Sequence, residues 1–275
     1  MKQTAAILTK NGAVQLELPD PDLDVVPGVP WGRIEAFPTP AYWCYQVLAQ
    51  RVSGLPAEYK VGATLAEEVG ACLLSGYGIP ANIAIAAFEH LRSRGAFSGT
   101  PPGEEQLVAW LKEPIRVGGR SVHYRFAARK ANYLARALPL VQQVPASLQG
   151  RELRDWLLQL PGVGYKTASM IVRNWQRADD VAILDIHLMR VGQVIGLFPM
   201  NLTVERHYLD LEERFLSLSA ALDLRAAELD ALIWYEMASS PLIARDMIEY
   251  LSSQAESSAP RRRNTAGAVN SLVAG

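Results

Sequence analysis

Two residues of this chain have the types and the setting needed for covalent chemistry: Lys166 and Asp185. Lys166 lies in the first turn of an expected helix, where the positive end of the helix dipole disfavours a charged amine. A neutral amine is a nucleophile. Asp185 ends the apolar run 181–184 and precedes another expected helix, so it would cap that helix and stay ionised. The alternatives are a solvated lysine on a helix surface and an N-cap with a structural role alone.

A Pro-Gly-x-Gly turn precedes Lys166 and separates two amphipathic segments, residues 151–159 and 165–174. The turn is too short for anything except two helices folded back on each other. Gly162 and Gly164 remove the Cβ atoms that would keep another molecule away from the backbone. Free N–H groups at the start of the second helix suit an anion such as a phosphate. The segment therefore indicates a helix–hairpin–helix on nucleic acid, with an ordinary helix corner as the alternative.

These residues resemble the signature of the helix–hairpin–helix, Gly/Pro-rich, Asp-containing DNA glycosylases. The motifs are Leu-Pro-Gly-Val-Gly-Tyr-Lys at 160–166 and Leu-Asp-Ile-His at 184–187. The hairpin lysine is similar to that of the bifunctional members, and its separation from the Asp-x-His motif is most similar to 8-oxoguanine DNA glycosylases with AP lyase activity. With two cysteines the chain cannot hold the four-cysteine iron–sulfur cluster of the endonuclease III type. Weaker resemblance extends over residues 40–237.

The resemblance implies a base-excision repair enzyme that flips a damaged base out of double-stranded DNA. Asp185 would stabilise the positive charge that develops on the sugar, and Lys166 would attack C1′ to form a Schiff base. That intermediate would permit β-elimination at the 3′ phosphate. The expected base is an oxidised purine, most simply 8-oxoguanine, and no cofactor is expected. Relatives hold a structural cation on backbone carbonyls that correspond here to Leu158, Leu160 and Val163.

The resemblance also implies which side chains bind the flipped base. Trp234 falls on an aromatic position that would stack on a purine, worth about 1–3 kcal/mol. Asp230 falls on a glutamine position, which is a departure because a carboxylate only accepts hydrogen bonds. Met237 shares their helix face, and His187 is expected to contact a phosphate or the pocket wall. A core tryptophan and a structural histidine are the alternatives.

The glycine-rich stretch 75–82 resembles the loop that enters the duplex and fills the gap left by an extruded base. Asn82 corresponds to the asparagine of that loop, and Tyr77 and Ile79 are the candidate wedges. The alternative is a turn in which the isoleucine and the tyrosine are buried.

A basic, aromatic-rich segment lies between residues 112 and 136, where seven lysines or arginines accompany one acidic residue. Such clustering favours contact with a phosphate backbone. Arg125 resembles the arginine that reads the base opposite the lesion, and Arg129 belongs to the same segment. A solvated helix face is the alternative.

The rest of the sequence predicts a mainly α, two-lobed helical bundle. Residues 1–38 are expected to form an N-terminal arm with one short strand near 13–18. Residues 39–251 would be the helical glycosylase body, with the hairpin motif at 151–174 and a small β-hairpin near 115–123 around Gly-Gly. Residues 252–275 are expected to be a disordered tail. An N-terminal β domain of the eukaryotic type does not fit into the first 38 residues.

Composition limits the class of protein. The chain has 275 residues, of which 49% are hydrophobic and 20% charged, typical of a soluble globular protein. Because the net charge is −1, a DNA surface requires local clustering of basic residues. Cys44 and Cys72 are expected to be reduced core thiols, with a disulfide between them as the alternative. Neither a signal peptide nor a membrane-spanning run is evident, so we expect the protein in the cytoplasm, associated with the nucleoid if bacterial. We also expect a monomer.

Two other functions remain open from the sequence. One is a glycosylase for a different damaged or modified base, which Asp230 and the short N-terminal segment favour. The other is a non-catalytic helix–hairpin–helix DNA-binding protein, which the presence of both Lys166 and Asp185 disfavours.

Overall fold

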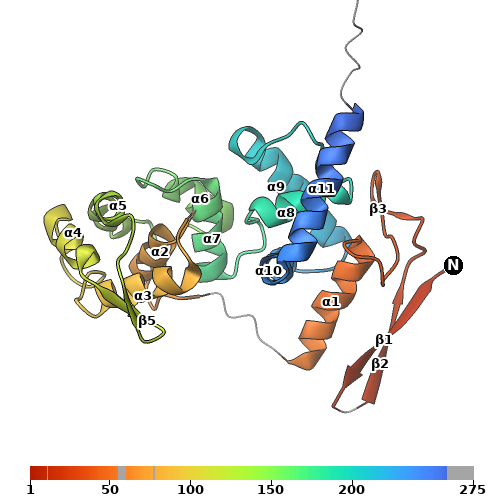
Figure 1. Ribbon diagram of the computed structural model, residues 1–275, viewed down its shortest axis with the longest axis horizontal. Helices are drawn as coiled ribbons and strands as arrows, with labels where there is room; N and C mark the ends of the chain where they lie inside the picture. The colour runs from red at the N-terminus through yellow and green to blue at the C-terminus, as the bar shows by residue number, and fades with distance from the viewer. Residues whose placement is uncertain (11, 55–59, 77, 259–275) are drawn as a thin grey trace, which may run out of the picture.

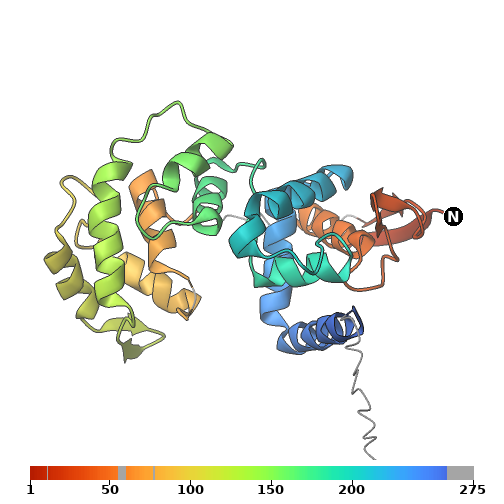
Figure 2. The ribbon, with the colours of Figure 1, turned by 90° about the horizontal axis from the view of Figure 1, so that it is seen from above.

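The computed structural model of the chain describes residues 1–10, 12–54, 60–76 and 78–258. They form two helical lobes that lie side by side, with the N-terminal strands on the side of the second lobe that faces away from the first (Figure 1 and Figure 2). The strands in these ranges form separate two-stranded antiparallel sheets. The prediction of a mainly α, two-lobed molecule is confirmed.

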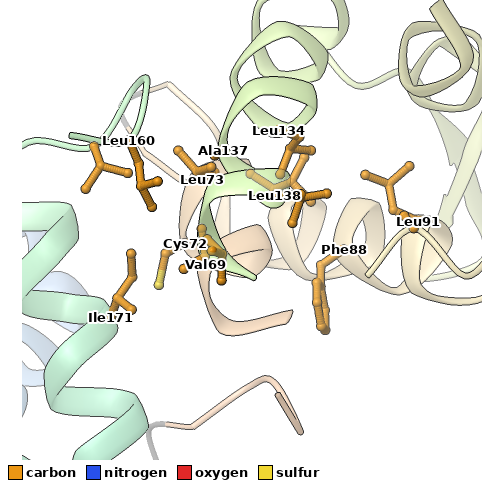
Figure 3. Close-up of a cluster of buried hydrophobic side chains, with 14 of the residues drawn as sticks. Val69, Cys72, Leu73, Phe88, Leu91, Leu134, Ala137, Leu138, Leu160 and Ile171 are labelled. Carbon is orange, nitrogen blue, oxygen red and sulfur yellow. The ribbon is translucent and has the colours of Figure 1, made fainter. Parts of the chain in front are cut away.

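The first lobe is built from the middle of the chain. Its elements are α2 (Leu65–Leu74), α3 (Ala81–Arg92), α4 (Glu104–Lys112), β5 (Ile115–Val117), β6 (Arg120–Val122), α5 (Ala127–Val141), α6 (Gly150–Leu157) and α7 (Tyr165–Gln176). Buried side chains such as Leu73, Phe88 and Leu134 form its core (Figure 3). The predicted β-hairpin is present, with Val117 paired to Arg120 across the two glycines.

The second lobe combines one early helix with the end of the chain. Its helices are α1 (Pro40–Ser53), α8 (Ile186–Val194), α9 (Val204–Ala221), α10 (Ala226–Ser239) and α11 (Pro241–Ser258). Trp43, Phe198 and Phe215 are among its buried side chains. The hydroxyl of Thr39 accepts a hydrogen bond from the Tyr42 N–H at 3.2 Å, so α1 begins at the expected Thr-Pro cap.

The boundary between the two hydrophobic cores falls between Val181 and Ala182. Val181 packs in the core of the first lobe, and Ala182 packs in the core of the second. The segment 177–185, which joins α7 to α8, therefore carries the chain from one core to the other. Lys166 lies on the first-lobe side of this crossing, and Asp185 lies at its end.

The N-terminal segment contains more β structure than the single strand that we expected. β1 (Gln3–Thr9) pairs with β2 (Gly12–Leu18), and β3 (Asp24–Val26) pairs with β4 (Val29–Pro30). The Gln3 side-chain amide donates to the carbonyls of Pro19 and Gly32 and accepts from the Ile34 N–H. This side chain thus fixes the first hairpin to the loop before α1, a contact between distant residues that local sequence does not reveal.

The last described helix, α11, extends to Ser258 and so enters the range 252–275 that we expected to be a tail. Residues 259–275 lie outside the described residues. Within the described ranges, no helix combines the length and apolar character needed to cross a membrane.

The two cysteines are free and buried, one in each core, as expected. Burial raises the pKa of the Cys44 thiol to about 11 and raises that of Cys72 well above its ordinary value. Both side chains therefore act as core residues.

Candidate active site

The predicted helix–hairpin–helix is formed by α6, a short turn and α7. Gly162 has a φ of +82°, and a Cβ there would lie 2.4 Å from the Tyr133 ring, so glycine is required by both backbone and packing. At Gly164 a Cβ would meet no atom within 4 Å, which leaves the backbone open to a partner. The N-cap residue of α7 is Gly164, and among the described residues no side chain caps this N-terminus. The N–H groups of its first turn are therefore free to bind an anion.

Lys166 lies in this first turn of α7 and is exposed. Within the described ranges its amine makes no hydrogen bond or ion pair. The preceding residue is held firmly: the Tyr165 ring stacks on Tyr208 of α9 with centroids 5.1 Å apart, and the Arg154 guanidinium lies over it at 5.4 Å. The start of α7 is thus fixed against the second lobe while the amine stays accessible.

Asp185 caps α8, as predicted. Its Oδ1 accepts hydrogen bonds from the N–H groups of His187 at 2.8 Å and Leu188 at 2.9 Å, and the residue is 9% exposed. The second carboxylate oxygen has no hydrogen-bond partner among the described residues. One oxygen therefore anchors the helix, and the other is available to a bound molecule.

The charges of Lys166 and Asp185 both affect the pKa of His187. The pKa of its imidazole is lowered, first by burial and then by the positive charges of Arg190 and Lys166, while the Asp185 carboxylate opposes the change. A neutral imidazole is the result at neutral pH. Its Nδ1 is buried without a hydrogen-bond partner within the described ranges. The amine and the carboxylate, from opposite sides of the lobe boundary, thus both affect the protonation of one ring.

The three residues expected to bind a base from α10 have different positions. Trp234 is 50% exposed, whereas Asp230 is 5% and Met237 1% exposed. Met237 packs in the second core, and Asp230 forms an ion pair with Arg173 of α7 at 2.6 Å. The expectation that Asp230 and Met237 face a base is not met in this structure. Helical spacing places all three residues on one face of α10. However, α7 covers this face at Asp230, and the second core covers it at Met237.

The candidate wedge loop is only partly exposed. Ile79 is half-buried against the first core, which agrees with the alternative of a buried isoleucine. Asn82 is exposed in the first turn of α3, and its side-chain oxygen accepts from the Ile83 N–H at 3.0 Å. Tyr77 lies outside the described residues.

The basic segment leaves both expected DNA-binding arginines exposed. The Arg125 guanidinium lies 5.3 Å from the Phe126 ring centre, and Arg129 Nε donates to the Tyr133 hydroxyl at 2.9 Å. Because Tyr133 also packs on Gly162, this surface adjoins the hairpin. Lys130 differs, since its amine donates to the Leu73 and Ser75 carbonyls at the end of α2, and burial lowers its pKa.

A family model described as 8-oxoguanine DNA glycosylase matches residues 57–224 of the 275. The chain belongs to the 8-oxoguanine DNA glycosylase family. The matched range includes the hairpin, Lys166 and Asp185, and it ends before Trp234 and the rest of α10. Membership agrees with the resemblance inferred from the two motifs.

Relatives of the family align with the central part of the chain. An 8-oxoguanine DNA glycosylase/AP lyase of Methanocaldococcus jannaschii is 32% identical over 131 residues, or 45% of this chain and 62% of that protein. One of Metallosphaera sedula is 31% identical over 146 residues, or 51% of this chain and 72% of that protein. The chain thus spans less than two thirds of the first relative and somewhat more of the second.

Solved structures agree with the fold. The M. jannaschii 8-oxoguanine glycosylase/lyase in complex with 15mer DNA containing 8-oxoguanine has a TM-score of 0.50 and 26% identity, with 64% of this chain and 81% of that chain covered. The 8-oxoguanine DNA glycosylase of Thermotoga maritima has a TM-score of 0.54 and 23% identity, with 71% and 96% covered. The two-lobed helical architecture is therefore that of the family.

Proposed function

We propose that this chain is a base-excision repair enzyme that releases 8-oxoguanine from double-stranded DNA and then cleaves the strand by β-elimination. The observation that carries the proposal is that Tyr208 joins the two segments that carry Lys166 and Asp185. Its ring stacks on Tyr165, next to the exposed Lys166, and its hydroxyl binds the backbone of Leu184, next to Asp185. The family membership and the relatives named 8-oxoguanine DNA glycosylase/AP lyase support the substrate and the two activities.

The chemistry follows from these two groups. The base leaves with the electron pair of its glycosidic bond, and the Asp185 carboxylate stabilises the positive charge left on the sugar. The Lys166 nitrogen forms a bond to C1′, and opening of the sugar ring gives a protonated Schiff base. This cation acidifies the C2′ hydrogen. Loss of that proton expels the 3′ phosphate, and water then releases Lys166.

DNA binding is assigned to surfaces around the hairpin. The open N-terminus of α7, with Gly162 and Gly164, would bind one phosphate of the damaged strand. Arg125 and Arg129, exposed beside it, would bind the duplex, and Asn82 would approach the extruded position. Trp234, half exposed on α10, would stack on the flipped base.

Three secondary features complete the proposal. The enzyme acts as a monomer in the cytoplasm and uses no cofactor for its chemistry. The carbonyls of Leu158, Leu160 and Val163 remain a proposed site for a structural cation. The Leu160 carbonyl already accepts the Val163 N–H at 3.1 Å and would use its second lone pair for the ion.

The test is borohydride trapping on a duplex with a single 8-oxoguanine opposite cytosine. We expect the wild-type protein to release the base and to form a covalent adduct, and Lys166→Gln to do neither. The matched control is Lys10→Gln, which changes an exposed lysine on the N-terminal hairpin and should leave both activities intact. An adduct formed by Lys166→Gln would refute the assignment of the lysine.

A different damaged or modified base is the second candidate. It is favoured by the position of α10, since Asp230 is buried and Trp234 lies outside the range that matches the family. Duplexes with single lesions, each opposite cytosine or adenine, separate the two candidates. Release of an alkylated purine or an oxidised pyrimidine at least ten times faster than 8-oxoguanine would establish the second.

A further inference from the structure

Two buried carboxylates of the second lobe, Glu212 on α9 and Asp230 on α10, make the same unusual pair of contacts. Each binds an arginine of the hairpin helices with one oxygen. With the other oxygen it binds a backbone N–H of the crossing segment, residues 177–185 between α7 and α8. Glu212 is 2% exposed and Asp230 is 5% exposed.

Asp230 connects the helix that carries Lys166 to the segment that carries Asp185. Its Oδ1 accepts from Arg173 Nη1 at 2.6 Å, and its Oδ2 accepts from the Ile183 N–H at 3.4 Å. Arg173 lies on α7, two helical turns after Lys166, and Ile183 precedes Asp185 by two residues. One carboxylate thus contacts both the helix that carries Lys166 and the segment that ends in Asp185.

Glu212 makes the same two kinds of contact, with the other hairpin helix and with the residue before Ile183. It accepts from Arg154 Nη1 on α6 with Oε2, and its Oε1 accepts from the Ala182 N–H at 2.9 Å. The Arg154 guanidinium also lies over the ring of Tyr165, the residue before Lys166. The Arg154–Glu212 and Arg173–Asp230 pairs therefore connect both hairpin helices to consecutive residues of the crossing segment.

Stability by itself is a poor explanation for these contacts. Removing two charges from water is costly, and well-packed apolar residues often stabilise such an interface equally well. Apolar residues cannot, however, hold the Ala182 and Ile183 N–H groups at fixed positions. These two carboxylate contacts therefore help to orient the crossing segment.

We propose that Glu212 and Asp230 are positioning residues, a double carboxylate clamp that sets the Asp185 carboxylate opposite the Lys166 amine. The clamp acts through the backbone of residues 182–183 and through Arg154 and Arg173, and neither carboxylate contacts DNA. This inference rests on the proposed function, because its kinetic effect is measured on base release.

The first experiment replaces each pair by apolar residues of similar size: Arg173→Met/Asp230→Leu and Arg154→Met/Glu212→Leu. We expect both variants to fold, with a melting temperature lowered only by the loss of one backbone partner, and to keep their affinity for a duplex with an abasic-site analogue. The single-turnover rate of base release should fall by about 10- to 100-fold, since misplacement by about 1 Å costs that much. Wild-type rates in both folded variants, or affinity that falls in step with the rate, would overturn the clamp.

A matched pair of single substitutions provides the control. Glu212→Gln and Glu213→Gln change neighbours on α9 that each bind an arginine of α6, but of the two only Glu212 itself accepts a backbone N–H of the crossing segment. Glu212→Gln should slow base release and Glu213→Gln should not. If an apolar pair does not fold, Asp230→Asn replaces it, because the amide keeps an acceptor for Arg173 and loses the one for Ile183. An unchanged rate in Asp230→Asn would then refute the proposal.

Hydrogen exchange separates failure of the clamp from failure of the proposed function. Without DNA, the Ala182 and Ile183 amides should exchange at least about ten times faster in the apolar variants than in the wild type, while the α5 core amides stay protected. A wild-type protein inactive on every lesion would refute the proposed function and leave this test valid. Unchanged exchange at both amides would refute the clamp even in an active enzyme.

Discussion

Tyr165 and Tyr208 stack with their ring centroids 5.1 Å apart, which joins the first turn of α7 to α9 across the lobe boundary. The Tyr208 hydroxyl donates to the Ala182 carbonyl at 2.7 Å and accepts from the Leu184 N–H at 3.4 Å. Burial raises its pKa, so the hydroxyl keeps its proton at all pH values of interest. The residue before Lys166 is thus joined, through one tyrosine, to the backbone before Asp185.

Tyr208→Phe should keep the ring contact and remove both hydrogen bonds to the crossing segment. Because a buried carbonyl and a buried N–H would lose this partner, we expect a loss of about 1–3 kcal/mol in the free energy of unfolding. Urea unfolding monitored by fluorescence measures it. Tyr250→Phe, on the exposed side of α11, is the control, and an equal loss there would argue against the assignment.

Asp185→Asn should slow base release by at least about 100-fold while leaving DNA affinity within about threefold. Asparagine is as good an N-cap as aspartate, so α8 should remain stable, but its side chain cannot stabilise a cationic sugar. The measurements are single-turnover excision and binding to uncleavable substrate. Asp185→Ala, which also loses the cap, should in addition lower stability by about 1 kcal/mol. Loss of binding in step with activity would count against a catalytic role.

Trp234→Ala should weaken binding of a duplex with a flipped lesion by about 1–3 kcal/mol, with little change in stability. The side chain is half exposed, so its removal leaves no large cavity. Met237→Ala on the same helix should have the opposite effect. We expect its free energy of unfolding to fall by about 2–5 kcal/mol, and its discrimination between 8-oxoguanine and guanine to stay unchanged. Equal effects of the two substitutions on lesion binding would contradict the positions described for α10.

The stability difference between the wild type and Asp230→Asn should depend on pH. Burial raises the pKa of Asp230 from 3.8 to about 7, against the opposing effects of Arg173 and the Ile183 N–H. Between these two values the folded state binds a proton that the unfolded state has released. The contribution of Asp230 to stability therefore falls as pH rises from about 4 to about 7 and is constant above that range. Urea unfolding of both proteins at pH 4.5, 6 and 8 measures the difference, and a difference that grows with pH would contradict the raised pKa.

The sequence by itself determined the features that depend on near neighbours in the chain. The Pro-Gly-x-Gly turn predicted the helix–hairpin–helix, the Gly118-Gly119 pair predicted β5 and β6, and Asp185 was predicted as an N-cap. Each follows from steric freedom or from hydrogen bonds within a few residues. These local rules, with the two motifs, were also sufficient for the family.

Only the tertiary structure decided which polar side chains face inward. Helical spacing grouped Asp230 with Trp234. In the structure, Arg173 of α7 packs against Asp230, whereas Trp234 stays half exposed. Lys130 likewise belongs to the basic segment, but its part-buried amine donates to the Ser75 carbonyl at the end of α2. Burial of a charged group depends on the partner that packing supplies, and these partners lie tens of residues away. The clamp behind the candidate site is such a contact, so no local pattern could predict it.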